Sequence, residues 1–525
     1  MRRAPVALAV PATAVAALVC LPLVYLVVRA AGRGGEAWNV LLRARTGELV
    51  ADTAVLVAVV TGAAVLVAVP LAWLVTRTDL PGRRAWAVSA ALPLVIPSYV
   101  AALALLAAFG PTGLLQRLLE QPFGIERVPE LYGLGGAVLA LTISTYPYVF
   151  LLTAVALRNV DPALEETARG LGQSRLSTFA RVTLPLVRPS VGAGALLAAL
   201  YALSDFGAVS LMQASSLTRA IFLQYRSLFD RTPAAVLALV LVALTAVVLA
   251  LELRARGHGR YARLGAGAAR PVAPVRLGRW RWPALAFCAT VVGVSLGAPL
   301  AVLAYWFSRA ASLDELRGVW APAASSVAVS ASAALLAVAA ALPVALLAAR
   351  HPARWSRLLE RLAYGANALP GIVIAFSLVF FAANYASPVY QTLVLLVFAY
   401  VVRFFAQAVA ATHAAVLQVS PRLEDAARGL GRSPGAAFAA VTAPLVAPGL
   451  LAGAALVFLS AMKELPATLL LRPIGFDTLA TEVWTATTVG AYSRAAVPAL
   501  VLVAVSAPFV YLLLRHGAEA LDAPG

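Results

Sequence analysis

Two stretches of the chain carry the same pattern of acids, glycines and prolines. The first, residues 161–190, reads DPALEETARGLGQSRLSTFARVTLPLVRPS, and the second, residues 420–449, reads SPRLEDAARGLGRSPGAAFAAVTAPLVAPG. The two align without a gap at a constant offset of 259 positions, which joins Glu166 to Asp425. Neither copy contains a cysteine or a histidine, so the pattern does not indicate a metal site or a nucleophile–base pair. Carboxylates on capped, exposed helices instead predict a docking surface.

Each copy is expected to form two short helices joined by an elbow. The first helix has an N-cap at Asp161 or Ser420 and a proline at its first helical position. Gly170 and Gly172, matched by Gly429 and Gly431, are expected to end this helix in a left-handed turn. A serine two residues later caps the second helix, which we expect to stop before the next proline. The predicted docking residues are Glu165, Glu166, Ala168, Gly172 and Pro185 in the first copy, and Glu424, Asp425, Ala427, Gly431 and Pro444 in the second.

The composition places both stretches in a membrane protein. Of the 525 residues, 62% are hydrophobic and 12% are charged, and the mean hydropathy is +0.88. A soluble globular domain is about half apolar and about a quarter charged. A helix of about 20 apolar residues crosses the hydrocarbon core of a bilayer. Twelve such runs are predicted, at residues 6–29, 52–76, 87–109, 134–157, 190–211, 233–252, 283–307, 324–348, 362–383, 390–416, 449–471 and 495–514.

The offset of 259 positions is close to half of the chain, which indicates a tandem duplication of a six-span unit. An even number of spans gives both units the same orientation and relates them by a pseudo-twofold axis along the membrane normal. The predicted fold is an all-α integral membrane protein with about twelve transmembrane helices in two tandem six-helix halves. The predicted divisions are a first half at 1–253 with a docking loop at 159–189, an arginine-rich linker at 254–281, and a second half at 282–525 with a docking loop at 418–448.

The arginines predict the orientation, because basic residues in short loops stay in the cytoplasm. Arg2, Arg3, the linker and the loops after the second and eighth spans fall on one side if both termini are cytoplasmic. The net charge of +18 is therefore mainly a topology signal, and nucleic acid is not an expected partner. The glycine, proline and alanine content of the linker predicts a flexible tether. The first apolar run is longer than the core of a secretion signal, which favours an uncleaved anchor.

Charged residues also interrupt the apolar spans near their outer ends. Asp205 and Glu464 are related by the same offset of 259, and Ser204 and Lys463 precede them. From Pro189 to Asp205 a helix rises roughly 24 Å, which is most of the way across the hydrocarbon core. Charged groups at that depth are expected to face a wet cavity or the interface between the halves. One hypothesis makes these residues the entry or gate of a pathway for a cationic substrate. The alternative is structural, with Lys463 paired to Asp205.

The repeated stretches resemble the cytoplasmic signature of the permease subunits of binding-protein-dependent ABC importers. That signature is Glu-Ala-Ala, a glycine six residues after the glutamate, and then Leu-Pro. It stands here as Glu166-Thr167-Ala168 with Gly172 and Leu184-Pro185, and as Asp425-Ala426-Ala427 with Gly431 and Ala443-Pro444. The resemblance implies that each loop is a coupling helix seated on an ATP-binding cassette ATPase dimer. It also implies an extracytoplasmic substrate-binding protein, a place in the lipid bilayer of the bacterial inner membrane, and no cofactor.

The substrate is less sharply indicated than the machinery. Fused permeases with two six-span halves are most similar to the iron(III) import family, and the segments 201–213 and 462–484 resemble its members most closely. Importers of thiamine, phosphonate or polyamines are alternatives. A secondary transporter driven by an ion gradient is an alternative of another class, but it would give the duplicated docking loops no role.

The sequence places the energy source outside this chain. A phosphate-binding P-loop needs a lysine followed by serine or threonine after a glycine-rich turn. The single lysine, Lys463, is followed by Glu464 in an apolar span. Cys20 and Cys288 lie in apolar spans and the four histidines are scattered, so no metal site is predicted. We therefore expect a transport subunit rather than an enzyme.

Overall fold

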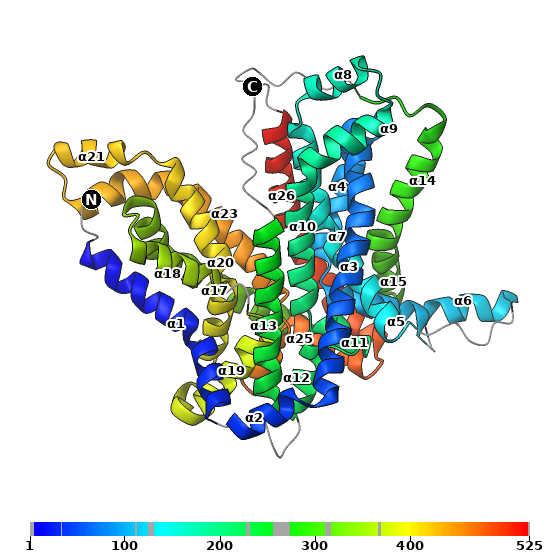
Figure 1. Ribbon diagram of the computed structural model, residues 1–525. Coiled ribbons are helices and arrows are strands. Elements are labelled where there is room, and N and C mark those ends of the chain that lie inside the picture. Colours follow the sequence, from blue (N-terminus) through cyan, green and yellow to red (C-terminus); the bar gives the residue numbers. More distant parts are fainter. Residues whose placement is uncertain are drawn as a thin grey trace. The chain divides into compact units, whose positions relative to one another are not determined.

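The computed structural model describes residues 5–32, 34–110, 113–123, 131–226, 232–255, 274–309, 317–365 and 369–522 (Figure 1). Within these residues the regular structure is helical, apart from one isolated parallel bridge between Thr78 and Val275. Arg2, Arg3 and residues 256–273 of the predicted linker lie outside the described residues. The expectation of an all-α membrane protein is confirmed.

The chain divides into two compact units that differ from the two halves of the sequence. The first unit contains Met1–Thr46, Ala220–Val242 and Ser312–Glu482, and the second contains Gly47–Arg219, Ala243–Ala311 and Val483–Gly525. The first helix of each sequence half therefore packs with the later helices of the other half. In the first unit, for example, α1 (Val6–Ala31) packs against α17 (Trp320–Arg350) and α19 (Gly371–Tyr385).

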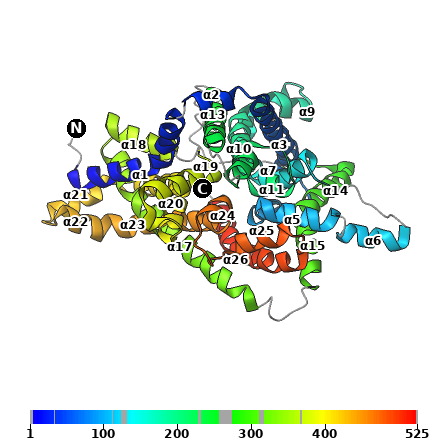
Figure 2. The same ribbon diagram turned by 90° about the horizontal axis from the view of Figure 1, so that it is seen from below.

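In the first unit, α17, α20 (Leu393–Gln418) and α23 (Ala443–Met462) pack against one another. Figure 2 shows these three helices side by side. The other elements that lie wholly in this unit are α2 (Gly34–Leu41), α18 (Arg354–Gly365), η6 (Ser387–Val389), α21 (Pro421–Gly429), α22 (Pro434–Ala437), η7 (Phe438–Thr442) and α24 (Pro466–Leu471).

In the second unit, α7 (Leu134–Asn159) packs against α5 (Ser98–Phe109) and α10 (Leu184–Ser204). The other elements that lie wholly in this unit are α4 (Arg83–Ala91), η1 (Leu92–Val95), α6 (Leu114–Phe123), α8 (Pro162–Gly170), α9 (Arg175–Thr178), η2 (Phe179–Thr183), α11 (Gly207–Leu211), η3 (Gly278–Trp280), α14 (Arg281–Val292), η4 (Gly293–Gly297), α15 (Ala298–Phe307) and α26 (Tyr492–Asp522). Four helices have residues in both units: α3 (Ala44–Arg77), α12 (Leu217–Arg226), α13 (Thr232–Ala255) and α25 (Leu479–Thr488).

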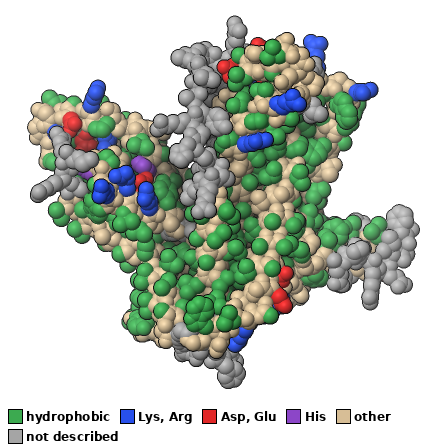
Figure 3. All heavy atoms as spheres, in the orientation of Figure 1, with side chains coloured by type: hydrophobic (Ala, Val, Ile, Leu, Met, Phe, Trp, Pro, Cys, Tyr) green, Lys and Arg blue, Asp and Glu red, His purple; other side chains and the backbone are tan. Residues whose placement is uncertain are grey.

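Among the described residues, eleven helices are long and apolar enough to cross a membrane. They correspond to eleven of the twelve predicted spans. The remaining span, predicted at 362–383, contains the shorter apolar helix α19. Figure 3 shows hydrophobic side chains along the sides of these helices, which suits a surface that faces lipid.

The third predicted span of each half is broken at a proline. The chain bends between α4 and α5, and Pro97 precedes the first residue of α5. In the same way, Pro370 precedes the first residue of α19. The prediction of continuous helices over 87–109 and 362–383 was therefore wrong. A proline lacks the N–H that a helix interior needs and disfavours helical geometry at the residue before it.

The two halves differ in length between their third and fourth spans. Pro97 and Pro370 are 273 positions apart, whereas the starts of α7 and α20 are 259 apart. The extra residues of the first half lie in the segment that carries α6. Structural counterparts before this insertion therefore differ by 273 positions, and counterparts after it differ by 259.

Small residues set the helix spacing at matching positions. A Cβ atom built on Gly194 would lie 2.6 Å from the Cα of Val149, and one built on Gly453 would lie 2.7 Å from the Cβ of Ala411. The two glycines are 259 positions apart. Close approach at glycine is a common way to pack membrane helices, and here it holds α10 against α7 and α23 against α20.

Candidate functional site

The first docking loop forms the predicted cap and turn. The carboxylate of Asp161 accepts a hydrogen bond of 3.0 Å from the backbone N–H of Ala163 at the start of α8. The helix ends at Gly170, and Gly172 in the turn after it has a φ of +85°, which lies in the left-handed region. The hydroxyl of Ser174 accepts from the N–H of Ser177, which caps the next helix. These features are as predicted.

The second docking loop repeats this geometry with one difference. Gly431 has a φ of +87°, and the hydroxyl of Ser433 accepts from the N–H of Ala436. Ser420 occupies the N-cap position of α21, but its side chain makes no capping hydrogen bond. The prediction that Ser420 caps the helix with its hydroxyl was therefore wrong.

The second helix of each loop continues into the membrane. We expected it to stop before Pro185 or Pro444. Instead a π turn, η2 or η7, joins it to α10 or α23, with Leu184 N–H bonded to the carbonyl of Phe179 and Ala443 N–H bonded to that of Phe438. The wider π turn accommodates a proline that an α-helical interior would not. The second helix of each loop is thus continuous with a membrane span.

One face of each loop is open to solvent and carries a leucine beside an acid. In the first loop Glu166 is exposed and the Leu171 side chain is 79% exposed. In the second loop Asp425 is exposed and Leu430 is 87% exposed. Leu164 and Leu423 are also exposed on these helices. Because these residues stand beyond the ends of the apolar spans, lipid does not account for their exposure. An exposed apolar residue at the same position in both loops fits a protein contact.

The other face of the first loop is buried against the membrane helices. The hydroxyl of Thr183 donates a hydrogen bond of 2.6 Å to Oε1 of Glu165. The same carboxylate oxygen lies 3.6 Å from Nη2 of Arg77, the last residue of α3. Arg77 also donates to the carbonyl of Val160, which ends α7, at 3.3 Å. Glu165 and Arg77 are both buried, and so is Ala168.

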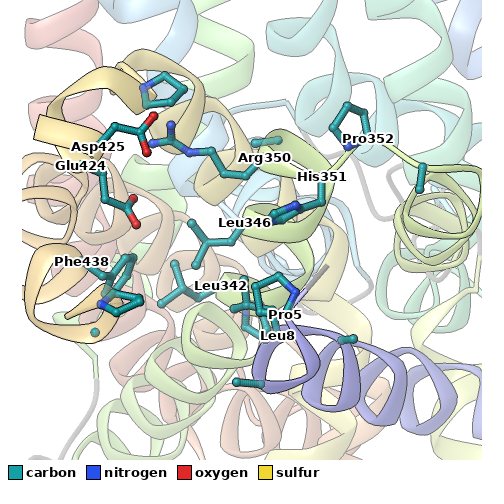
Figure 4. A pocket seen from close by; sticks show the side chains of 18 of the residues that line it. Pro5, Leu8, Leu342, Leu346, Arg350, His351, Pro352, Glu424, Asp425 and Phe438 are labelled. Atoms are coloured by element: carbon teal, nitrogen blue, oxygen red, sulfur yellow. The ribbon is translucent and has the colours of Figure 1, made fainter. Parts of the chain in front are cut away.

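The second loop has the matching contacts in a more open setting. Thr442 donates to Oε2 of Glu424 at 3.1 Å, and Arg350 donates to the carbonyl of Val419 at 3.1 Å. Arg350 extends from the end of α17 toward α21 (Figure 4). A pocket of about 1160 Å³ lies here, lined by the start of α1, the end of α17, α21 and α22. Its counterpart beside Arg77 and Glu165 has a volume of only about 20 Å³.

Comparison with known proteins identifies the scaffold. The family of binding-protein-dependent transport system inner membrane components matches residues 64–253 and 341–516. The chain is 32% identical over 503 residues to the Fe(3+)-transport system permease protein FbpB 2 of Haemophilus influenzae, which covers 95% of this chain and 96% of that protein. The chain belongs to this permease family. Both docking loops lie within the matched segments.

Other relatives match a shorter part of the permease. It is 38% identical over 117 residues to the molybdenum transport system permease protein ModB of Escherichia coli, which covers 22% of this chain and 50% of that protein. It is 31% identical over 115 residues to the putative ferric transport system permease protein FbpB 1 of Haemophilus influenzae, which covers 22% of this chain and 18% of that protein. Relatives that are named for different substrates thus share short segments with the permease.

The permease breaks its fifth and eleventh spans at the predicted acids. The helix α10 ends at Ser204, and Asp205 takes an extended conformation with its side chain 8% exposed. The carboxylate of Asp205 accepts from the N–H groups of Ala208 at 2.9 Å and Val209 at 3.3 Å, and from the hydroxyl of Ser98. Asp205 therefore caps the short helix that follows it.

Glu464 occupies the corresponding break in the eleventh span. The helix α23 ends at Met462, so Lys463 and Glu464 do not lie on one helix as we expected. Glu464 is 9% exposed, and its Oε1 accepts from the N–H of Ala467 at 3.2 Å. A Cβ built on Gly371 would lie 2.7 Å from this oxygen, so the acid fits against the first residue of α19. Both acids make helix-cap contacts, and Asp205 also accepts a hydrogen bond from Ser98 at the start of α5.

The sequence interpretation missed the threonines and the arginines that lie on the buried side of each docking loop. Thr183 and Thr442 lie inside the repeated stretches, 259 positions apart, and this match was a usable signal. Arg77 and Arg350 are 273 positions apart, so a gapless alignment at 259 does not pair them. Each of these arginines is the last residue of its helix, where a basic side chain is favourable.

Proposed function

We propose that this permease moves iron(III) into the cytoplasm, driven by ATP hydrolysis in a separate subunit. The observation that carries the substrate is the similarity over nearly the whole chain to a permease named for Fe(3+) transport. Matches to molybdenum permeases cover about a fifth of the chain, a length that fits shared machinery rather than a shared substrate. Molybdenum compounds, thiamine, phosphonate and polyamines are the competing substrates.

We propose that the two loops dock an ATP-binding cassette ATPase dimer in the cytoplasm, one loop on each subunit. Glu166 with Leu171, and Asp425 with Leu430, present a charged rim around an apolar contact. Interfaces commonly use this combination of a buried apolar anchor and a polar rim. The left-handed glycine beside each leucine fixes the direction in which the leucine points.

The direction of transport follows from this placement of the ATPase. With both loops and both termini in the cytoplasm, the breaks at Asp205 and Glu464 lie near the outer ends of their spans. An extracytoplasmic binding protein would deliver the substrate at that side. In this proposal the two acids, with Ser204 and Lys463, line the entry of the pathway and favour a cation. Their capping contacts also support a structural role for the two acids.

A reconstitution experiment tests the proposed substrate. The permease is purified with its ATPase, placed in proteoliposomes with ATP on the ATPase side, and given the binding protein on the other side. Uptake of radioactive iron(III) should require both partners and ATP. Molybdate, thiamine and a polyamine serve as matched arms of the same assay. Uptake of one of these in place of iron(III) would identify it as the substrate. The proposal of an ATP-driven importer would then still stand.

A further inference from the structure

The two neighbouring acids of each docking loop differ in exposure. Glu166 and Asp425 are exposed, whereas Glu165 is buried and Glu424 is half-buried and lines the same pocket as Asp425. An acid that faces inward is poorly placed to contact an ATPase. The inward acids therefore need a separate explanation, which their partners supply.

In the first loop the inward acid joins α8 to the ends of three membrane helices. We call Arg77, Glu165 and Thr183 the first clamp. Thr183 is the last residue of the π turn that leads into α10, and Arg77 is the last residue of α3. Arg77 also holds the carbonyl of Val160 at the end of α7. One carboxylate and one guanidinium thus connect α8 with α3, α7 and α10.

The second loop repeats the arrangement in the other unit. We call Arg350, Glu424 and Thr442 the second clamp. Thr442 ends the π turn that leads into α23, and Arg350 ends α17 and holds the carbonyl of Val419 at the end of α20. The acids and the threonines of the two clamps differ by 259 positions, and the arginines by 273, as the insertion before the fourth span requires. The threonine–acid and arginine–carbonyl hydrogen bonds therefore recur in two separately packed units, whereas among the described contacts the arginine–acid ion pair occurs in the first clamp alone.

We propose that the two clamps are positioning devices that make each docking loop move together with its membrane helices. The proposal rests on the proposed docking of an ATPase, and it assigns Glu165 and Glu424 to the inner side of that junction. A carboxylate that has lost contact with water depends on its partners, so a buried clamp does not open at low cost. Movement imposed on the outer face of a loop is then passed to α3, α7 and α10 through the first clamp, and to α23 through the hydrogen bond between Thr442 and Glu424 in the second.

The two clamps differ in how they are closed. The first clamp, which lies in the second unit, is covered by a neighbouring extended segment. Val275 of this segment pairs with Thr78, and its N–H donates to the carbonyl of Arg77 at 2.8 Å. Val275 lines the small space of about 20 Å³ beside the first clamp. The second clamp instead borders the pocket of about 1160 Å³. The second clamp has less surrounding structure to hold it, so loss of its threonine should cost more coupling than loss of Thr183.

The test removes the threonine hydroxyls and leaves the outer faces of the loops intact. The variants are Thr183→Val, Thr442→Val and the pair together, with Thr183→Ser and Thr442→Ser as conservative versions. Thr178→Val is the matched control, because this buried threonine in the same loop donates only to the carbonyl of Ser174 among its described hydrogen bonds. Glu165→Gln with Glu424→Gln is a second set, because a glutamine retains an acceptor for the threonine. Each variant is purified with its ATPase and assayed for hydrolysis and uptake in proteoliposomes.

The expected result is that the valine variants, which lose a buried hydrogen bond, and the glutamine set, which loses the ion pair between Glu165 and Arg77, retain the ATPase and lose about tenfold in substrate moved per ATP hydrolysed. The serine variants and the control should behave as the unmodified protein does. Unchanged transport per ATP in both sets would overturn the clamp proposal. Release of the ATPase by these variants would also overturn it, because the inward acids would then belong to the docking surface. The docking proposal is tested separately by Leu171→Asp with Leu430→Asp, which should release the ATPase.

Discussion

Replacement of the two left-handed glycines tests the docking loops at the positions where the backbone conformation most disfavours a side chain. Gly172 and Gly431 have φ values of +85° and +87°, and a Cβ added at either would meet nothing within 4 Å. The cost of a side chain there is consequently a backbone cost and not a clash. A left-handed conformation costs an L-residue roughly 1–2 kcal/mol, and a β-branched residue is especially disfavoured there. Each loop should therefore leave its native turn in favour of a relaxed one.

The size of the effect follows from this cost. A free energy of about 1–2 kcal/mol changes the ratio of two conformations by a factor of about 5–30. In Gly172→Val or Gly431→Val, the neighbouring leucine would point away from its docking position for most of the time. The matched controls are Gly170→Val and Gly429→Val. These glycines stand two positions earlier, also have open space at the Cβ, and do not have a positive φ.

The assay is hydrolysis of ATP by the reconstituted complex, with and without the loaded binding protein, together with recovery of the ATPase during purification. In the positive-φ variants we expect the binding protein to lose most of its effect on ATP hydrolysis, and less ATPase to be recovered with the permease during purification. The controls should lose little of either. Equal behaviour of Gly172→Val and Gly170→Val would refute the argument that the left-handed turn orients the docking face.

Three further predictions follow from other parts of the permease. Asp205→Asn and Glu464→Gln should assemble with the ATPase and lose uptake if the acids line the pathway; normal uptake in both would reject that role, and loss of assembly would favour the capping role. Separate expression of the halves, divided within residues 265–269, should retain substantial transport, since Val275 stays with the second half and can still pair with Thr78 of the first half; loss of transport with both halves stably inserted would give the linker an active role. The N–H of Leu277 lies 2.9 Å from the Asp79 carboxylate, and Asp79→Ala removes this acceptor. The variant should lower the melting temperature of the complex by a few degrees at most. An unchanged melting temperature would show that this hydrogen bond adds nothing to stability.

The sequence alone supports much of the scaffold. Long apolar runs predict membrane helices because no other local structure satisfies a backbone in hydrocarbon. A repeated glycine next to a capped helix predicts a left-handed turn, and Gly172 and Gly431 confirm it. These features depend on residues close together in the chain. They are therefore visible without knowledge of the packing.

The remaining features depend on contacts that local patterns do not encode. The exchange of first helices between the packed units joins residues such as Pro22 and Ser377, whose hydroxyl donates to the proline carbonyl at 2.7 Å. The helix was expected to stop before Pro185, because a proline usually ends it, but a π turn carries it through. Arg77 and Arg350 were missed because an insertion shifts the alignment of the two halves between them and their acids.

The linker illustrates the same limit. Its glycine and proline content predicted only a tether, and residues 256–273 lie outside the described residues. At its C-terminal end, however, Val275 pairs with Thr78, and Leu277 donates to Asp79. Composition does not reveal such contacts, because extended residues bind through their backbone regardless of side chain.

Uptake into proteoliposomes that contain the permease and its ATPase tests the central claim most directly. In separate assays the binding protein is loaded with iron(III), molybdate, thiamine or a polyamine and is supplied outside the vesicles. ATP is supplied on the ATPase side. The account predicts ATP-dependent accumulation of iron(III), which Gly172→Val with Gly431→Val abolishes and Gly170→Val with Gly429→Val preserves. Accumulation that proceeds without ATP or without the ATPase, driven by an ion gradient alone, would contradict it.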